Sequence, residues 1–410
     1  MAVQLRFLAQ QVPPYLIDLP WPAPLEEWDH PLLVTRARGP SRHTVRFVSD
    51  GEKAYALKEM TAPEAEREYR MLREMRSERL PAVEAAGLVT GRETPDGEPL
   101  PAVLVTRFLD YSLPFRYLFG TEGGRGLVAK LIDAAVVLLV RAHVDGFYWG
   151  DCSLSNLLFR RDAGALMAYL VDAETSEHRA RPLSDGMRES DLDLAKENIA
   201  GGLLDLEAEG ALSTDIDIVE LVTLLSDRYT LLWNELTGTL DIDAREKHLI
   251  DQRIRRINEL GFDVEELVVE HAPAGDRIRV VPALVEEGHH VRELMRMTGL
   301  EVQENQARRL LNDIASYGAF LARFEGAHPP QAVAAARWLG EVYEPIVARI
   351  PQDMRGRLEP PELFHELLEH RYYLSEAAGY EVDNDTGLKS YLDSVLRFRP
   401  REQVVLPDEG

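Results

Sequence analysis

The sequence predicts a protein of the α+β class, in which a strand-rich first part precedes a mainly helical second part. Residues 32–60 read as three strands, with Ser49-Asp50-Gly51-Glu52 as the turn between the last two. From about residue 190 onward, apolar residues recur mainly at helical spacing. The 410 residues amount to about twice the size of one domain, so we expect two or three packed units.

The elements expected in the first part follow from proline positions and from apolar patterning. Six prolines within residues 1–31 prevent a long helix and favour an extended N-terminal arm that packs on the rest. The segments LLVTRA, TVRFVS and KAYALKEM predict the three antiparallel strands. Pro63 suits the first turn of a helix, which residues 64–80 continue with helix-forming side chains. The segment PAVLVTRFL then predicts one further strand.

The remaining elements are a buried helix, two hairpins and a series of amphipathic helices. Residues 127–145 are apolar nearly all round a helix, which predicts that this helix is buried. The segments NLLFRR and LMAYLVDAE predict two short strands joined by the hairpin signal Asp162-Ala163-Gly164. A second hairpin is expected between FDVEELVVEH and RIRVVPAL. The amphipathic stretches that predict helices are residues 214–236, 243–260, 301–325, 331–349 and 361–379.

Charge and composition exclude several classes of protein. With 70 acidic and 46 basic side chains the formal net charge is -24, which disfavours binding to nucleic acid or to anionic lipid. Cys152 is the only cysteine, so an intramolecular disulfide and a cysteine-based zinc site are excluded. The longest apolar stretch, residues 131–140, contains Asp133 and is too short to span a bilayer. Together with an N-terminus that lacks signal-peptide character, this predicts a cytoplasmic protein that is not membrane-embedded.

A strand and the helix after it offer groups for binding a nucleotide. Phosphate transfer from ATP needs metal ions, a lysine on the phosphates and a carboxylate at the attacking hydroxyl. Lys58 is expected to end a strand, and Ala56, two residues earlier, shares its face, so that adenine would lie over Ala56 while Lys58 reaches the phosphates. We choose Glu68 to hold Lys58, because it precedes Leu72 by four residues and shares a helix face with it.

A loop and a strand end further along offer a base and metal ligands. Asp151 and Asn156 lie five residues apart in a loop just before a strand, and can present a base and a metal-binding amide to one phosphate. Asp172 ends the strand at residues 169–171, where a carboxylate is costly unless a cation or donor meets it. Glu174 offers a second acidic ligand.

The order of these groups resembles the protein-kinase superfamily, in which a VAIK-type lysine, a helix glutamate, an HRD-type loop and a DFG-type aspartate recur. The stretch from His143 to Phe159 looks closest to the atypical branch, and is similar to lipopolysaccharide-core sugar kinases and small-molecule phosphotransferases. The resemblance implies a bilobal domain with an N-lobe at residues 32–112 and a C-lobe at 113–235. Residues 236–410, expected to form a mainly helical domain with a small hairpin, resemble only actinobacterial proteins with a C-terminal domain of unknown function, number 4032.

The resemblance also implies cofactors and roles. ATP and Mg²⁺ would be the cofactors, and the acceptor would be a hydroxyl of a small molecule or saccharide. Lys58 would bind the α and β phosphates and Glu68 would anchor it. Asp151 would act as the base, while Asn156 and Asp172 would bind Mg²⁺.

Departures from the family pattern keep a second hypothesis open. The phosphate loop, Arg38-Gly39-Pro40-Ser41-Arg42-His43, holds one glycine, so Ser41 or Arg42 would have to substitute for close backbone contacts. Trp149 replaces the usual loop histidine, and Ala173-Glu174 replaces the Phe-Gly of DFG. No APE-like segment follows, which disfavours a protein substrate; MRESDLDLAKE instead resembles the DLA helix of atypical kinases. The alternative is a pseudokinase that binds nucleotide or acts as a regulatory scaffold, with a protein partner on the C-terminal domain.

Two further features receive the plainer interpretation. Cys152, beside Asp151, is expected to be a buried and inert thiol rather than a redox sensor. Residues 291–314 resemble a helix-turn-helix in outline, but packing within a helical bundle fits an acidic chain better.

Overall fold

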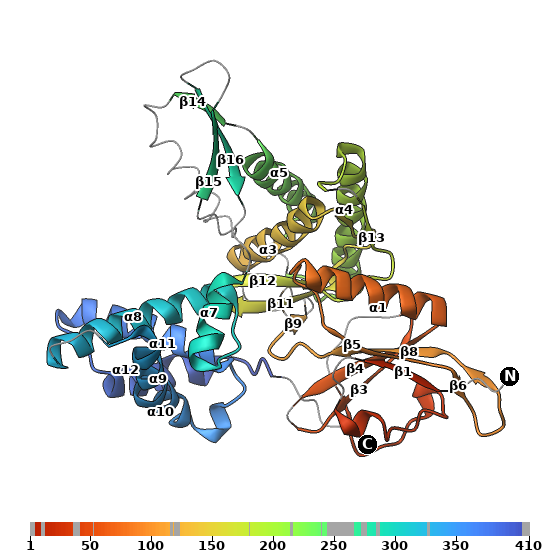
Figure 1. The fold of residues 1–410 in the computed structure, drawn as a ribbon, viewed down its shortest axis with the longest axis horizontal. Coiled ribbons are helices and arrows are strands. Elements are labelled where there is room, and N and C mark those ends of the chain that lie inside the picture. Colours follow the sequence, from red (N-terminus) through yellow and green to blue (C-terminus); the bar gives the residue numbers. More distant parts are fainter. Residues whose placement is uncertain are drawn as a thin grey trace. The chain divides into compact units, whose positions relative to one another are not determined.

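The computed structural model describes residues 5–9, 13–35, 42–51, 53–114, 118, 124–179, 181–213, 216–238, 240–243, 266–271, 277–283, 288–325 and 329–403 (Figure 1). It confirms the α+β class, with a sheet-rich N-terminal region and a helical C-terminal region. The chain forms two compact units. The first unit holds most of residues 1–283, and the second unit holds residues 160–167 together with 284–404. The lobe and domain boundaries at residues 31, 112 and 235 stay predictions.

A six-stranded antiparallel sheet opens the first unit, in the order β1-β5-β8-β4-β3-β2. Its strands are β1 (Arg6–Ala9), β2 (Leu33–Val34), β3 (Thr44–Ser49), β4 (Ala54–Met60), β5 (Ala85–Thr90) and β8 (Ala102–Arg107). The strands predicted in residues 32–60 and in PAVLVTRFL are confirmed, whereas β1 and β5 were not predicted. Lys58 in β4 lies opposite Val45 of β3 and Leu104 of β8, in the middle of the sheet.

The two faces of the sheet carry different partners because strand side chains alternate. Tyr55 and Leu57 of β4 belong to a core cluster with Trp21 and Trp28, so the N-terminal arm packs on one face as expected. The arm includes the short 3₁₀ helices η1 (Pro14–Leu16) and η2 (Leu25–Glu27). Ala56 and Lys58 are out of phase with Tyr55 and Leu57, and so belong to the opposite face.

Helix α1 (Ala62–Ser77) confirms the helix predicted after the third strand. It begins with a capping box, in which the Thr61 backbone N–H donates to the Glu64 carboxylate at 3.2 Å, and Pro63 occupies the first turn. The helix lies along β5 and β8 (Figure 1) and buries Glu68 and Leu72 on one face. Their shared face follows from their four-residue spacing.

The rest of the first unit is built on helices and short strands. The predicted buried helix is α3 (Gly124–Val144), whose residues Leu131, Leu139 and Val140 are almost fully buried, and it packs against α5. The other elements are β6 (Arg92–Glu93), β7 (Pro99–Leu100), β9 (Leu113–Pro114), β10 (Phe147–Tyr148), η3 (Leu154–Asn156), β11 (Leu157–Asp162), β12 (Ala165–Leu170), β13 (Glu177–His178), α4 (Asp185–Ala208) and α5 (Ile218–Thr237). Residues 160–167, at the tip of the hairpin formed by β11 and β12, belong to the second unit.

A three-stranded antiparallel sheet follows α5, in the order β14-β16-β15. It consists of β14 (Leu240–Asp243), β15 (Glu266–His271) and β16 (Arg277–Ala283). The predicted second hairpin is therefore confirmed in β15 and β16. The helix expected at residues 243–260 lies outside the described residues, apart from Asp243 at the end of β14.

The second unit is a helical bundle around one core. Its elements are α7 (His289–Thr298), α8 (Glu304–Glu325), α9 (Gln331–Trp338), a π-helical turn η4 (Leu339–Tyr343), α10 (Glu344–Ala348), η5 (Gln352–Met354), α11 (Pro360–Ala378), α12 (Asn384–Ser394) and η6 (Leu396–Phe398). Leu294 of α7 and Ile314 of α8 are buried in the same core as Trp338 and Phe364. This supports bundle packing for residues 291–314. None of the helices in the described ranges has the length and apolar character needed to cross a membrane.

The tip of the β11–β12 hairpin belongs to the second unit and places a carboxylate in its interior. Asp162 is 1% exposed. It accepts hydrogen bonds from the Asn305 backbone N–H (3.2 Å), the Asn305 Nδ2 (3.0 Å) and the Gln306 backbone N–H (2.8 Å). These donors lie at the start of α8, where free backbone N–H groups favour a carboxylate.

The titration of Asp162 makes the stability of the chain depend on pH. Burial raises the pKa of its carboxyl from 3.8 to about 6. Protonation therefore contributes stability, up to about 3 kcal/mol, that is present below about pH 4 and lost as the pH rises through about 6. Asp162→Asn cannot titrate, so its loss of unfolding free energy in urea should be larger at about pH 4.5 than at about pH 7.5. Equal losses at both pH values would contradict the raised pKa.

Candidate functional site

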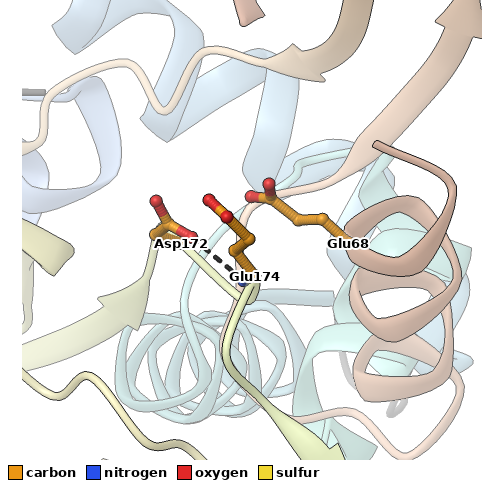
Figure 2. A group of neighbouring side chains, drawn as sticks. All are labelled: Glu68, Asp172 and Glu174. Atoms are coloured by element: carbon orange, nitrogen blue, oxygen red, sulfur yellow. Dashed lines mark hydrogen bonds between the residues drawn. The ribbon is translucent and has the colours of Figure 1, made fainter. Parts of the chain in front are cut away.

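One lysine and three carboxylates meet at the centre of the first unit. Lys58 Nζ donates to Asp172 Oδ2 at 2.7 Å and to Glu68 Oε2 at 3.0 Å, and lies 3.6 Å from Glu174 Oε2. Figure 2 shows Glu68 reaching from helix α1 toward Asp172 and Glu174, which lie on the segment after β12. Residues separated by more than 100 positions in the chain are thus brought together, including the helix glutamate that was chosen from its spacing.

The charges of this cluster are unevenly balanced, because one ammonium serves several carboxylates. Burial by itself lowers the pKa of Lys58, but the carboxylates of Glu68 and Asp172 outweigh burial, so the pKa is raised and the amine stays charged. Burial, reinforced by the nearby charge of Asp172, raises the pKa of Glu68 to about 7. Glu68 is the most deeply buried acid of the cluster. The single charge of Lys58 does not compensate the charge of Glu68 fully, so the pKa of Glu68 is raised even though the amine of Lys58 stays charged.

The excess of acidic oxygens suits a divalent cation. Oxygen atoms of Glu68, Asp172 and Glu174 lie within 4.8 Å of one another. Carboxylate oxygens are the ligands that Mg²⁺ prefers. Because the side chain of Glu68 is only 1% exposed, whereas that of Asp172 is 29% exposed, Asp172 and its neighbour Glu174 are the better placed pair for a metal ion.

Asp151, the expected base, is held by an amide on each side. Its Oδ2 accepts from Asn156 Nδ2 at 2.9 Å, and its Oδ1 accepts from Asn198 Nδ2 of helix α4 at 3.0 Å. Since the amide nitrogen of Asn156 is engaged with Asp151, its oxygen is the atom left to meet a cation. Burial, and next the charge of Asp172, raise the pKa of Asp151.

The loop that carries Asp151 is fixed by a buried carboxylate that sequence reasoning missed. Asp191 of α4 is completely buried and accepts from the backbone N–H groups of Trp149 (2.7 Å) and Gly150 (2.8 Å). It also lies 3.0 Å from His143 Nε2, whose other ring nitrogen meets Tyr229. Loss of such a carboxylate would leave buried donors unpaired, at a cost of about 1–3 kcal/mol each.

Trp149 and Gly150 connect this loop to the segment around Asp172. Trp149 donates from Nε1 to the backbone oxygen of Asp172 at 3.1 Å. Gly150 has φ +77°, and a Cβ there would lie 3.2 Å from the backbone oxygen of Thr175, so only glycine fits without strain. Asp151 and Asp172 are therefore held in one framework.

The described part of the phosphate loop reaches the same cluster. Arg42 forms an ion pair with Glu174, and His43 Nε2 lies 3.0 Å from Glu174 Oε2. Burial alone raises the pKa of Glu174, but the bonds from Arg42 and His43 outweigh it, so the pKa is lowered and the group stays ionised. Ser41, the other residue expected to meet phosphate, lies outside the described residues.

These groups line a cleft of about 610 Å³. One end is lined by apolar and polar residues of the sheet, and the other end by the loop around Asp151 and by helix α4. The sheet end includes Val45, Phe47, Leu104 and Thr106, and the far end includes Ser153, Ser155, Asn198, Gly201 and Asp205. Ala56 does not line the cleft, although its register partners Phe47 and Thr106 do.

Asp191, Asn198 and His43 are the site residues that sequence reasoning missed. A usable signal was present for the first two. Asp191 and Asn198 lie seven residues apart, hence on one face of α4, within or next to the segment MRESDLDLAKE. Cys152, by contrast, is buried as expected, and burial raises the pKa of its thiol well above the ordinary value, which supports the interpretation as an inert thiol.

Comparisons with known proteins identify only parts of the chain. A family described as a domain of unknown function (DUF4032) matches residues 231–396, in agreement with the expected resemblance of the C-terminal part. No curated protein matches the chain. A solved structure titled "WaaP in complex with acyl carrier protein" is similar at 15% identity, covering 62% of this chain and 99% of that chain, with a TM-score of 0.37. A likeness at this level assigns no function to the chain.

Proposed function

We propose that the chain is a Mg²⁺- and ATP-dependent phosphotransferase with a protein-kinase-like catalytic unit, which transfers phosphate to a hydroxyl of a small molecule or saccharide. The observation that carries this proposal is the bonding of Lys58 to both Glu68 and Asp172, within 3.0 Å, in a cleft that Asp151 and Asn156 also line. These are the groups that phosphoryl transfer requires: a cation for the phosphates, oxygen ligands for Mg²⁺ and a carboxylate for the acceptor.

The sheet end of the cleft is the proposed nucleotide site. Val45, Phe47 and Leu104 offer an apolar surface to adenine, in place of the expected contact with Ala56. Lys58 would meet the α and β phosphates at the inner end of that surface. Arg42, whose side chain is 66% exposed, would add a second positive charge where the phosphate loop lacks glycines.

The metal site and the base follow from the donor set. Asp172, Glu174 and the amide oxygen of Asn156 would hold Mg²⁺, which neutralises charge on the phosphate during transfer. Asp151 would orient the acceptor hydroxyl and accept its proton while the acceptor oxygen bonds to the γ phosphorus. The bond from that phosphorus to the bridging oxygen breaks, ADP leaves with the electron pair, and the proton passes to solvent. The raised pKa of Asp151 makes it a better proton acceptor than an ordinary aspartate.

The far end of the cleft restricts the acceptor. Among the described residues that line this end, Ser153, Ser155 and Asn198 offer hydrogen bonds, Asp205 is acidic, and none is basic. Gly201 leaves open space where a side chain would lie. A neutral or cationic molecule with several hydroxyl groups fits this surface better than an anionic one.

A pseudokinase remains the second candidate, and one observation favours it. Asp172 and Glu174 are already bonded to cations of the chain itself, namely Lys58, Arg42 and His43. A chain that keeps these pairs closed would bind nucleotide weakly or not at all, and would act through its C-terminal domain as a scaffold. Nucleotide binding separates the two candidates.

Removal of the Asp172 carboxylate should weaken nucleotide binding. We expect wild type to bind ATP in calorimetry only when Mg²⁺ is present, and Asp172→Ala to bind at least about tenfold more weakly, because a metal ligand and a Lys58 partner are lost. Asp193→Ala is the matched control, since Asp193 is an exposed aspartate of α4 that pairs only with Lys196 in the described contacts. A wild-type chain without affinity for Mg-ATP would rule out the enzyme.

Removal of the proposed base should affect turnover rather than binding. With water as a surrogate acceptor, we expect Asp151→Asn to lower the rate of ATP hydrolysis by about 10²–10⁴-fold, the usual contribution of a general base. Its affinity for Mg-ATP should stay within about threefold of wild type, because the amide oxygen of the variant side chain can still accept from Asn198, while Asn156 keeps its bond to the backbone oxygen of residue 151. Hydrolysis at the wild-type rate would show that Asp151 is not the base.

A further inference from the structure

The β11–β12 hairpin joins two of the proposed metal-binding residues. Asn156 immediately precedes β11, and Asp172 follows the end of β12 by two residues. The Val171 backbone N–H donates to the Asn156 backbone oxygen at 3.1 Å, which ties the two ends of the hairpin together. The position of both metal-binding residues therefore depends on the conformation of a single hairpin.

The turn of this hairpin is bound by a buried carboxylate of α11. Glu362 is 2% exposed and accepts from the backbone N–H groups of Ala163 (2.7 Å) and Gly164 (3.2 Å). Ala163 has φ +52° and Gly164 has φ +84°, the pair of left-handed conformations that a two-residue hairpin turn requires. The left-handed region is unfavourable for alanine, so the hydrogen bonds to Glu362 help to stabilise this turn.

The residues beside the turn are bound by the same unit. Arg160 pairs with Glu359 at 2.5 Å, and Arg161 pairs with Glu402, which is 4% exposed, at 2.6 Å. Gln306 Nε2 links both sides of this network, since it donates to the Arg161 backbone oxygen and to Glu362 Oε2. Together with the bonds to Asp162, these contacts make the hairpin tip a fixed part of the second unit.

We propose that the second unit, which holds much of the segment matched by the domain of unknown function, is a positioning module for phosphate transfer, with Glu362 and Glu359 as positioning residues. This inference rests on the proposed function. The antiparallel hairpin is held at its turn by these carboxylates, and its other end carries Asn156 and Asp172. Mg²⁺ demands near-ideal octahedral geometry of its ligands, so small displacements of these two residues weaken its binding.

Two measurements test this role: the Mg²⁺ concentration that gives half-maximal ATP binding in calorimetry, and the Mg²⁺ concentration that gives half-maximal ATP hydrolysis. Glu362→Gln keeps the size of the side chain but turns an amide donor toward one of the two turn N–H groups. We expect the half-maximal Mg²⁺ concentration to rise about tenfold, with the maximal rate largely restored by excess Mg²⁺. A variant that is merely destabilised would lose active protein, and so lose maximal rate without any change in Mg²⁺ dependence.

The control makes the same chemical change elsewhere in the second unit. Asp313 is bonded to Trp338 Nε1 at 2.7 Å, apart from the hairpin contacts, so Asp313→Asn should leave the Mg²⁺ dependence unchanged. Glu359→Gln, which loses the charge facing Arg160, should raise the half-maximal Mg²⁺ concentration as Glu362→Gln does. This second variant provides the test if Glu362→Gln fails to fold.

The outcomes separate the two proposals. If wild type hydrolyses ATP and the folded hairpin variants show the same Mg²⁺ dependence as Asp313→Asn, the positioning role is wrong while the proposed function stands. If wild type neither binds nor hydrolyses Mg-ATP, the proposed function fails and the positioning role fails with it.

Discussion

The ammonium of Lys58 is the group on which the rest of the site depends, because carboxylates from two separate segments converge on it. Without it, the fully buried Glu68 would face Asp172 as an uncompensated like charge. The same pairs connect helix α1, through Lys58, to the segment after β12. The ion pairs that stabilise the fold here are therefore the ones that place the charged groups of the site. Arg42 pairs with Glu174 in the same cluster, so carboxylates of the cluster are met by cations of the chain itself.

Two buried carboxylates that do not line the cleft hold the backbone segments on which the cleft residues lie. Asp191 holds the backbone of the loop that leads to Asp151, and Glu362 holds the turn of the hairpin that carries Asn156 and Asp172. Each accepts from two backbone N–H groups in addition to its side-chain partner, His143 for Asp191 and Gln306 for Glu362. A carboxylate used in this way fixes the path of the chain, and the path of the chain decides where the reactive side chains lie.

Local signals predicted the parts of the fold and site that depend on local chemistry. The strands around Lys58, the helix of Glu68 and the two hairpins follow from alternation, spacing and turn residues. Strand β5 was missed because its segment AAGLVT is rich in residues with low strand propensity. The contact of Asp151 with Asn198 spans 47 residues, and the contact of the hairpin turn with Glu362 spans 199 residues. The spacing of residues within a helix or strand does not predict contacts between positions so far apart in the sequence. Only the order of the kinase-like groups indicated that remote residues would converge.

The most direct test of the central claim is labelling of Lys58 by an ATP analogue with a reactive acyl phosphate, followed by mass spectrometry of the peptides. The account predicts that the analogue acylates Lys58 in preference to the other lysines, since only this amine lies at the inner end of the cleft among the described residues that line it. It also predicts that excess Mg-ATP prevents the labelling. Labelling spread over exposed lysines, with Lys58 unmodified and Mg-ATP without effect, would contradict the account.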